Sequence, residues 1–290
     1  MLLLMTLLAC TDEAAMDSGT GAGDPAAQAT CGPEGGYRHW IVDSLYFARI
    51  EAEVSEGFDL DGDVSTTGGS GGCGLQDVTS PEGTPGVDNA FGRLLPFLET
   101  TEFIAAEGLI ESSIRNGELV LIPELAGVDD PLDDDCVRMA IRRGEEAPMT
   151  GTDSSLLAGQ TTSLDVSFDD QVFEEVAIVD GSAEGRPLQV TLPLQILNAS
   201  LEFTLMSGAI RYDLLEDGGL HGVFAGGLST DYLMQLLKTK NVDPAVAEAV
   251  AGILPAVADL DLDGDGECGE LSVTFEFTGV PAYVFEDQLE

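Results

Sequence analysis

Basic residues are the scarcest class in this 290-residue chain. It has 11 lysines and arginines against 53 aspartates and glutamates, for a formal net charge of -42. Lys238 and Lys240 are its only lysines, and its arginines are scattered apart from Arg142 and Arg143. Nucleic-acid phosphates are bound by clustered lysine and arginine, and anionic lipid headgroups would repel so acidic a surface. The composition therefore excludes nucleic acid as a partner and requires any membrane attachment to be covalent or hydrophobic.

Histidine is rarer still, with His39 and His221 as the two copies. A Ser-His-Asp or zinc site would have to use one of them, and neither has a neighbour at ligand spacing. Ser70 lies in a Gly-x-Ser-x-Gly string, but no predicted strand leads into it and no predicted helix leads out. We therefore expect no enzymatic activity. The alternative is an exported hydrolase that uses Ser70 with a histidine, or a pair of carboxylates.

No apolar run at the N-terminus is long enough to span a bilayer, since residues 1–9, MLLLMTLLA, are followed directly by Cys10 and an acidic stretch. The order Leu-Leu-Ala-Cys resembles the lipobox of bacterial lipoproteins. The resemblance implies that residues 1–9 are a signal peptide and that Cys10 carries the lipid that anchors the protein to a membrane. It also implies an outer-membrane or cell-surface location, facing the periplasm or the exterior.

Large apolar residues stay rare in residues 10–36, which predicts a flexible acidic tether. Beyond it the composition changes. The whole chain is 44% hydrophobic with a mean hydropathy of +0.12, which excludes wholesale disorder. We expect one β-rich globular domain over residues 37–290, with a candidate subdivision near residues 145–160.

Cysteines other than Cys10 form an even set in a chain expected to be exported, where disulfides persist. These four disulfide candidates are Cys31, Cys73, Cys136 and Cys268. Two bridges are expected, each contributing about 2–4 kcal/mol, and the sequence leaves all three connectivities open. The alternative is one bridge and two buried thiols.

The hydrophobic pattern is mostly that of strands. Alternating or β-branched stretches predict strands at residues 37–54, 118–125, 136–141, 164–168, 188–196, 201–205 and 271–277, and a hairpin that joins 210–214 to 220–224. Helical spacing predicts helices within residues 88–116, 231–240 and 244–258. We therefore expect an α+β, β-rich fold: an antiparallel sandwich-like or curled sheet, with a few short helices packed on one side.

The strongest chemical signal is the segment DLDLDGDGECGEL at residues 259–271. Alternating carboxylates followed by glycine suit calcium, which takes six to eight oxygen ligands on a sharply turning loop. The segment resembles the calcium loops of EF-hand and dockerin-type proteins, and two registers compete, one starting at Asp261 and one at Asp259. The candidate calcium ligands are Asp259, Asp261, Asp263, Asp265, Glu267 and Glu270. A solvated acidic turn is the alternative.

A second acidic cluster repeats this pattern as FDLDGD at residues 58–63, but Val64 stands where a loop glycine is expected. The weaker candidate ligands are Asp59, Asp61, Asp63, Asp77 and Asp88. They could converge on one site across long loops, although a plain helix cap explains Asp88 equally well.

Taken with the lipobox, the two Asp-rich segments and the sequence GVDN resemble uncharacterised Asp- and Gly-rich lipoproteins of Gram-negative bacteria. This resemblance implies a membrane location and calcium binding, but it implies no enzymatic activity. We expect a calcium-binding, membrane-anchored surface or periplasmic lipoprotein with a structural or binding role. A carrier that holds an apolar ligand between the strands of residues 188–205 and a helix is a further alternative, and a protein or glycan partner is left open.

Overall fold

The computed structural model describes residues 31, 36–68, 72–196, 199–239 and 244–285. The predicted signal peptide, Cys10, most of the predicted tether and Ser70 lie outside these residues. From Cys31 onward the chain forms one compact unit, and its first strand begins at Tyr37. Within the described part of the chain, no helix is long and apolar enough to cross a membrane.

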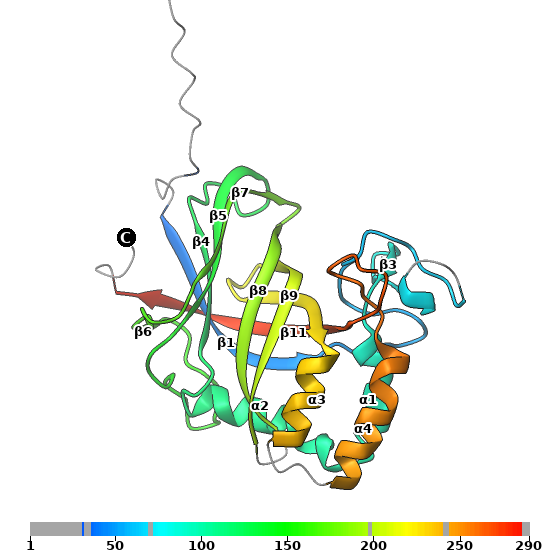
Figure 1. Cartoon of the computed structure of the whole chain (residues 1–290). Coiled ribbons are helices and arrows are strands. Elements are labelled where there is room, and N and C mark those ends of the chain that lie inside the picture. Colours follow the sequence, from blue (N-terminus) through cyan, green and yellow to red (C-terminus); the bar gives the residue numbers. More distant parts are fainter. Residues whose placement is uncertain (1–30, 32–35, 69–71, 197–198, 240–243, 286–290) are drawn as a thin grey trace, which may run out of the picture. The chain divides into compact units, whose positions relative to one another are not determined.

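A closed antiparallel barrel forms the centre of this unit (Figure 1). Among the described residues eight strands follow one another in the order β1-β4-β5-β7-β8-β9-β10-β11, and β11 pairs again with β1. The strands are β1 (Tyr37–Phe47), β4 (Leu121–Ala126), β5 (Asp134–Arg143), β7 (Gln171–Val179), β8 (Ser182–Ile196), β9 (Ala199–Leu214), β10 (Leu220–Ser229) and β11 (Glu270–Val284).

The predicted β-rich fold with a few short helices is confirmed, but the predicted sandwich-like or curled sheet is wrong. The sheet closes because β1 and β11 pair along most of their length, from His39 opposite Ala282 to Phe47 opposite Phe275. Sequence patterns show which strands alternate and not which strands meet, so the closure was missed.

Three short strands lie outside the barrel order. β6 (Gln160–Thr162) runs parallel to the end of β11, and β2 (Val78–Thr79) pairs with β3 (Pro85–Val87) in a small ribbon. The stretch 145–160, where a subdivision was a candidate, is a loop that carries the chain from β5 to β6.

Aromatic rings fill the barrel interior. The ring of Phe275 lies 4.6 Å from that of Phe47 and 5.2 Å from that of Phe224, measured between centroids. Tyr212 packs edge-on against Phe277, and its buried hydroxyl donates to a backbone carbonyl of β5 at 2.8 Å. A glycine at position 222 makes room, because a Cβ there would lie 2.0 Å from the Phe277 ring.

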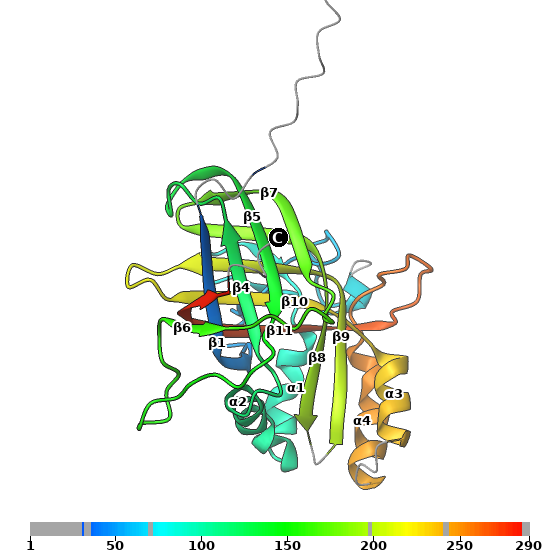
Figure 2. The same ribbon diagram turned by 90° about the vertical axis from the view of Figure 1, so that its left-hand side faces the viewer.

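Helices gather at one end of the barrel in both views (Figures 1 and 2). They are α1 (Ala90–Leu98), α2 (Ala106–Arg115), α3 (Thr230–Thr239) and α4 (Pro244–Val257), with the short 3-10 turn η3 (Glu102–Ala105) between α1 and α2. A further 3-10 turn, η2 (Gly72–Gly74), lies in the loops beside β3. The helical stretch predicted at 88–116 is therefore two helices. They separate at Glu99–Thr101, where the Thr101 hydroxyl accepts from the backbone N–H of Phe103 and starts η3.

The strand predicted at residues 164–168 is wrong. Leu164 makes a single bridge to Gly144, and the chain then turns, leaving Val166 88% exposed. The cause is local, because the Asp165 carboxylate accepts from both the backbone N–H and the hydroxyl of Ser167. Such a side-chain turn competes with strand pairing.

The described residues form two disulfides, Cys31–Cys136 and Cys73–Cys268, with Cα–Cα distances of 5.2 and 5.9 Å. The prediction of two bridges is confirmed, and the alternative of one bridge with two buried thiols is wrong. The first bridge ties Cys31, which lies six positions before the start of β1, to β5. The second joins the two Asp-rich segments.

Candidate metal centre

Residues 51–68, 72–89 and 259–269 form an extension on the outside of the barrel, here called the acidic lobe (the cyan and orange loops beside β3 in Figure 1). Phe58 fixes it to the barrel by packing against Ala209 on β9 and against Val223 and Ala225 on β10. These positions alternate with the ring-bearing interior positions, so they face outward.

Gly57 allows this close contact between lobe and barrel. Its φ is +148°, and a Cβ would lie 2.7 Å from Val87 Cγ1 and 3.1 Å from Thr274 Oγ1. Only glycine fits a position that combines this backbone angle with so little space. The lobe therefore meets the barrel at a fixed place, with Phe58 and Asp59 directly after the contact.

Asp59, Asp61 and Asp88 converge in the lobe, each offering one carboxylate oxygen, and these three oxygens lie within 4.8 Å of one another. Asp88 immediately precedes the Asn89 cap of α1 and is 1% exposed. Its Oδ2 accepts from the backbone N–H of Leu60 at 2.7 Å. No N–H or O–H group of the described residues donates to its Oδ1, which is buried.

Two more carboxylates lie beside this group. Asp77 lies near Asp88 and accepts from the backbone N–H of Ser65 at 2.5 Å. Asp259, 5% exposed, accepts from the backbone N–H of Ser272 at 2.7 Å and from its hydroxyl. The Ser272 oxygen in turn accepts from the first backbone N–H of α1, that of Ala90, at 2.7 Å. Residues from both Asp-rich segments therefore meet next to the start of α1.

The electrostatics of this cluster are unfavourable without a cation. Burial raises the pKa of Asp88 to about 9, and the charges of Asp61, Asp259 and Asp77 act in the same direction, against the Leu60 N–H. Burial also raises the pKa of Asp259 to about 6 despite its bonds to Ser272. Two carboxylates 4 Å apart repel by about 4 kcal/mol at an effective dielectric of 20. A bound cation would offset both the cost of burying the charged carboxylates and the repulsion between them.

The segment that gave the stronger sequence signal has different geometry. Asp261, Asp263 and Asp265 also bring one oxygen each within 4.8 Å of one another, but Asp263 and Asp265 are exposed. Their oxygens are occupied by backbone N–H groups of the same loop. Asp261 accepts from Gly264 at 2.8 Å and from Gly266 at 2.9 Å. The loop is satisfied as an acidic turn, and a cation would compete with these bonds.

Several predicted ligands lie outside both groups. Asp259 faces Ser272, so the register that starts at Asp261 is the one whose carboxylates meet. Glu270 accepts weakly from the Leu262 N–H at 3.4 Å, and Glu267 is exposed. Asp63 is exposed, and its backbone N–H donates to Asp61 at 2.8 Å.

The sequence interpretation missed a buried ionic cluster around Glu124, which is 0% exposed. Its carboxylate hydrogen-bonds with His39 at 3.0 Å and accepts from Arg142 at 2.8 and 3.1 Å and from Arg138 at 3.2 Å. Burial opposes ionisation, but the bonds from His39 and Arg142 outweigh it and lower the pKa of Glu124 to about 2. A lone glutamate in the apolar stretch LIPELA was the available signal.

His221, the second histidine, also lies beside carboxylates. Its Nδ1 is 3.2 Å from Asp213 and its Nε2 is 3.7 Å from Glu276. These two partners, with the charge of Glu56, outweigh desolvation and raise the pKa of His221 to about 9. The histidine is therefore a cation in an acidic surrounding at neutral pH.

Comparison with known protein families, with curated proteins and with solved structures found no match. The function has to be argued from the chemistry of the chain itself.

Proposed function

We propose that this protein is a calcium-binding lipoprotein, attached to a membrane through a lipid on Cys10 and facing the periplasm or the exterior, with a structural or binding role. The observation that carries the calcium proposal is Asp88. It is a buried carboxylate with an oxygen that receives no donor from the residues that the structure describes, and it lies against the carboxylates of Asp59 and Asp61. Buried polar groups are almost always satisfied, so this oxygen points to a missing ligand.

The donor set favours calcium over other metals. All candidate donors are carboxylate oxygens, which suit hard cations, whereas zinc and copper prefer histidine and cysteine. Every cysteine of the acidic lobe is in a disulfide. Calcium also tolerates irregular geometry, and backbone carbonyls or water can complete its shell. An affinity of about 10⁻⁴–10⁻³ M is typical of extracellular modules.

A cation at this centre would stabilise the whole lobe. Asp88 leads directly into α1, while Asp59 and Asp61 lie in the segment that follows the Gly57 contact with the barrel. Neutralising these side chains removes repulsion between segments that come from distant parts of the chain. Calcium then acts as a structural clamp that keeps the lobe on the outer face of β9 and β10.

The membrane address is supported by the lipobox-like residues around Cys10 and by the disulfides, which persist mainly outside the cytoplasm. Intact-mass analysis of membrane-extracted protein tests it. We expect a mature chain that begins at a lipid-modified Cys10. Retention of Met1, or a soluble protein with an unmodified Cys10, would sink this part of the proposal.

Two alternatives rank lower. An exported hydrolase would need a nucleophile activated by a histidine, but His39 Nε2 pairs with Glu124, and both ring nitrogens of His221 face carboxylates, those of Asp213 and Glu276. A carrier for an apolar ligand would need a cavity between the strands of residues 188–205 and a helix, whereas Leu188, Leu192 and Leu205 on these strands are buried in the hydrophobic core. Both observations support a structural or binding role.

Isothermal titration with calcium tests the metal centre directly. We expect saturable calcium binding by the full chain and loss of that binding in Asp88→Asn. Asp263→Asn makes the same carboxylate-to-amide change in the exposed loop and should retain calcium binding. The reverse pattern would keep calcium binding but move it to the loop of residues 261–265. Absence of binding by the unmodified chain at millimolar calcium would refute the proposal.

A further inference from the structure

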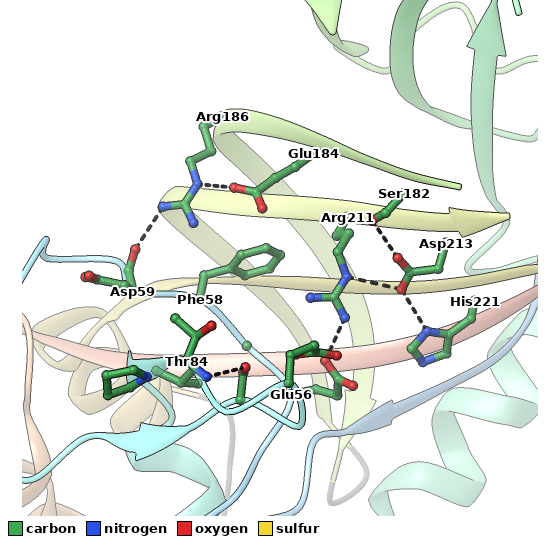
Figure 3. Close-up of a pocket in the computed structure, with 15 residues that line it drawn as sticks. Glu56, Phe58, Asp59, Thr84, Ser182, Glu184, Arg186, Arg211, Asp213 and His221 are labelled. Atoms are coloured by element: carbon green, nitrogen blue, oxygen red, sulfur yellow. Dashed lines mark hydrogen bonds and ion pairs between the residues drawn. The ribbon is translucent and has the colours of Figure 1, made fainter. Parts of the chain in front are cut away.

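A polar pocket of about 620 Å³ opens between the acidic lobe and the outer face of the barrel (Figure 3). One wall comes from outward-facing residues of β8, β9 and β10, among them Arg186, Arg211 and His221. The other comes from the segment around Phe58 and from the turn between β2 and β3. A volume of this size falls within the range of small-molecule sites.

The pocket gathers cations in a chain that has few of them. With 11 lysines and arginines and two histidines in 290 residues, three of these side chains line this one cavity. None belongs to the barrel core or to the metal centre. Such a concentration is hard to attribute to general surface composition, because the surrounding surface is strongly acidic.

Each cation is already paired, as the dashed lines of Figure 3 show. Arg211 donates to Glu56 at 2.7 Å and to Asp213 at 3.1 Å. Asp213 also accepts from the Ser182 hydroxyl at 2.7 Å and lies 3.2 Å from His221 Nδ1.

A second arginine–carboxylate pair lies at the rim of the pocket. Arg186 donates to Glu184 at 2.6 Å and to the backbone carbonyl of Asp59 at 2.8 Å. The basic side chains at both positions are therefore neutralised within the pocket.

Paired charges select the class of ligand. An anionic ligand would have to break one of these pairs, and it would also meet the carboxylates of Glu82 and Asp59, which line the same pocket outside the pairs; either step is costly. A neutral polyhydroxylated ligand avoids this cost. Each paired carboxylate keeps lone pairs and each guanidinium keeps N–H groups, and hydroxyl groups can both donate and accept. Because the pairs hold one another in place, the hydrogen-bonding groups are pre-organised.

We propose that the pocket between the acidic lobe and β8–β10 binds a neutral saccharide, held by hydrogen bonds to the Arg211–Asp213 and Arg186–Glu184 pairs. The inference goes beyond the proposed calcium function and does not require it. The two sites adjoin, since Asp59 lines the pocket and is also one of the three converging carboxylates.

The test uses the full calcium-loaded chain and an array of immobilised oligosaccharides in three groups: neutral hexoses and N-acetylhexosamines, uronate- or sulfate-bearing chains, and amine-bearing glucosamine chains. We expect binding to members of the neutral group. Glu184→Gln should weaken it about tenfold, as expected for weakening one hydrogen bond to a charged group. Thr84→Trp, which places a large side chain at an exposed position of the wall, should abolish it.

Glu216→Gln is the matched control, since it removes one exposed carboxylate from a turn outside the pocket and should leave binding unchanged. Melting temperatures of all variants establish that they fold. Binding to charged chains alone, binding that survives both Glu184→Gln and Thr84→Trp, or no binding to any member of the array would overturn the proposal. Calcium titration of the same samples keeps the two proposals apart, because saccharide binding can fail while calcium binding is retained.

Discussion

Asp88→Asn should change stability in opposite ways with and without calcium. The substitution keeps the shape of the side chain and an oxygen that can accept from the Leu60 N–H. It removes a buried carboxylate whose Oδ1 has no donor in the described chain and which lies close to four other acids, Asp59, Asp61, Asp77 and Asp259. In chelator we therefore expect the variant to be as stable as the unmodified chain, within about 1 kcal/mol.

With calcium the unmodified chain should become more stable than the Asp88→Asn variant. A cation that binds only the folded state stabilises by about 2.7 kcal/mol at 100 times its dissociation constant. For a folded unit of this size each kcal/mol raises the melting temperature by about 2–4 °C, so the unmodified chain should gain about 5–10 °C. Without the carboxylate of Asp88 we expect most of that gain to vanish.

Differential scanning calorimetry measures the melting temperatures of the unmodified chain and of Asp88→Asn, each in chelator and in excess calcium. Asp263→Asn is the matched control and should keep the full calcium-induced shift. Two results would refute the reasoning. If Asp88→Asn keeps the same calcium shift, the centre is elsewhere; if it loses several kcal/mol in chelator, Asp88 stabilises the fold by itself and its free oxygen needs no cation.

Four further outcomes can be measured by denaturant or thermal unfolding. Replacing Cys73 and its partner by alanine should cost about 2–5 kcal/mol and weaken calcium binding, because the bridge joins the two acidic segments. Gly57→Ala should cost about 1–3 kcal/mol by displacing the lobe, whereas Gly252→Ala, with nothing within 4 Å of its Cβ, should be neutral or stabilising. Glu124→Gln should cost about 3–5 kcal/mol because it removes the carboxylate that pairs with buried Arg142 and with Arg138, and in the unmodified chain this contribution should be lost as pH falls from 4.5 towards about 2. His221, with its pKa raised from 6.5 to about 9, should contribute about 1–2 kcal/mol that is complete below pH 6.5 and lost as pH rises through 9; an equally steep decline in His221→Gln would contradict this.

Sequence alternation located most strands because a strand with one buried face has a period of two. It failed at β7, where Phe173 and Val176 are both buried although three residues apart. The period breaks because Glu175 has a φ of +58° and β7 pairs irregularly with β5. A residue in this conformation leaves no mark in the hydrophobic pattern, so the strand could not be recognised.

Carboxylate spacing identified both acidic segments, but it did not indicate which of them contains a buried carboxylate oxygen without a donor among the described residues. The glycines of DGDG made residues 259–271 the better sequence match. The same glycines let the carboxylate of Asp261 accept from the loop's own backbone. The burial of the Asp88 carboxylate arises from tertiary packing. It depends on α1, on the Phe58 segment and on the neighbourhood of Asp259, and no local sequence pattern encodes these contacts.

The pairing of β1 with β11 has a consequence for how the chain folds. His39 lies opposite Ala282 and Phe47 opposite Phe275, so the closing contacts join the two ends of the folded unit. Contacts of such long sequence separation slow folding, because the loop entropy is lost before the contacts form. The barrel cannot close before its last strand is available, and until then β1 and β10 present open edges to other chains. A chain truncated before residue 270 should therefore aggregate rather than form a smaller barrel.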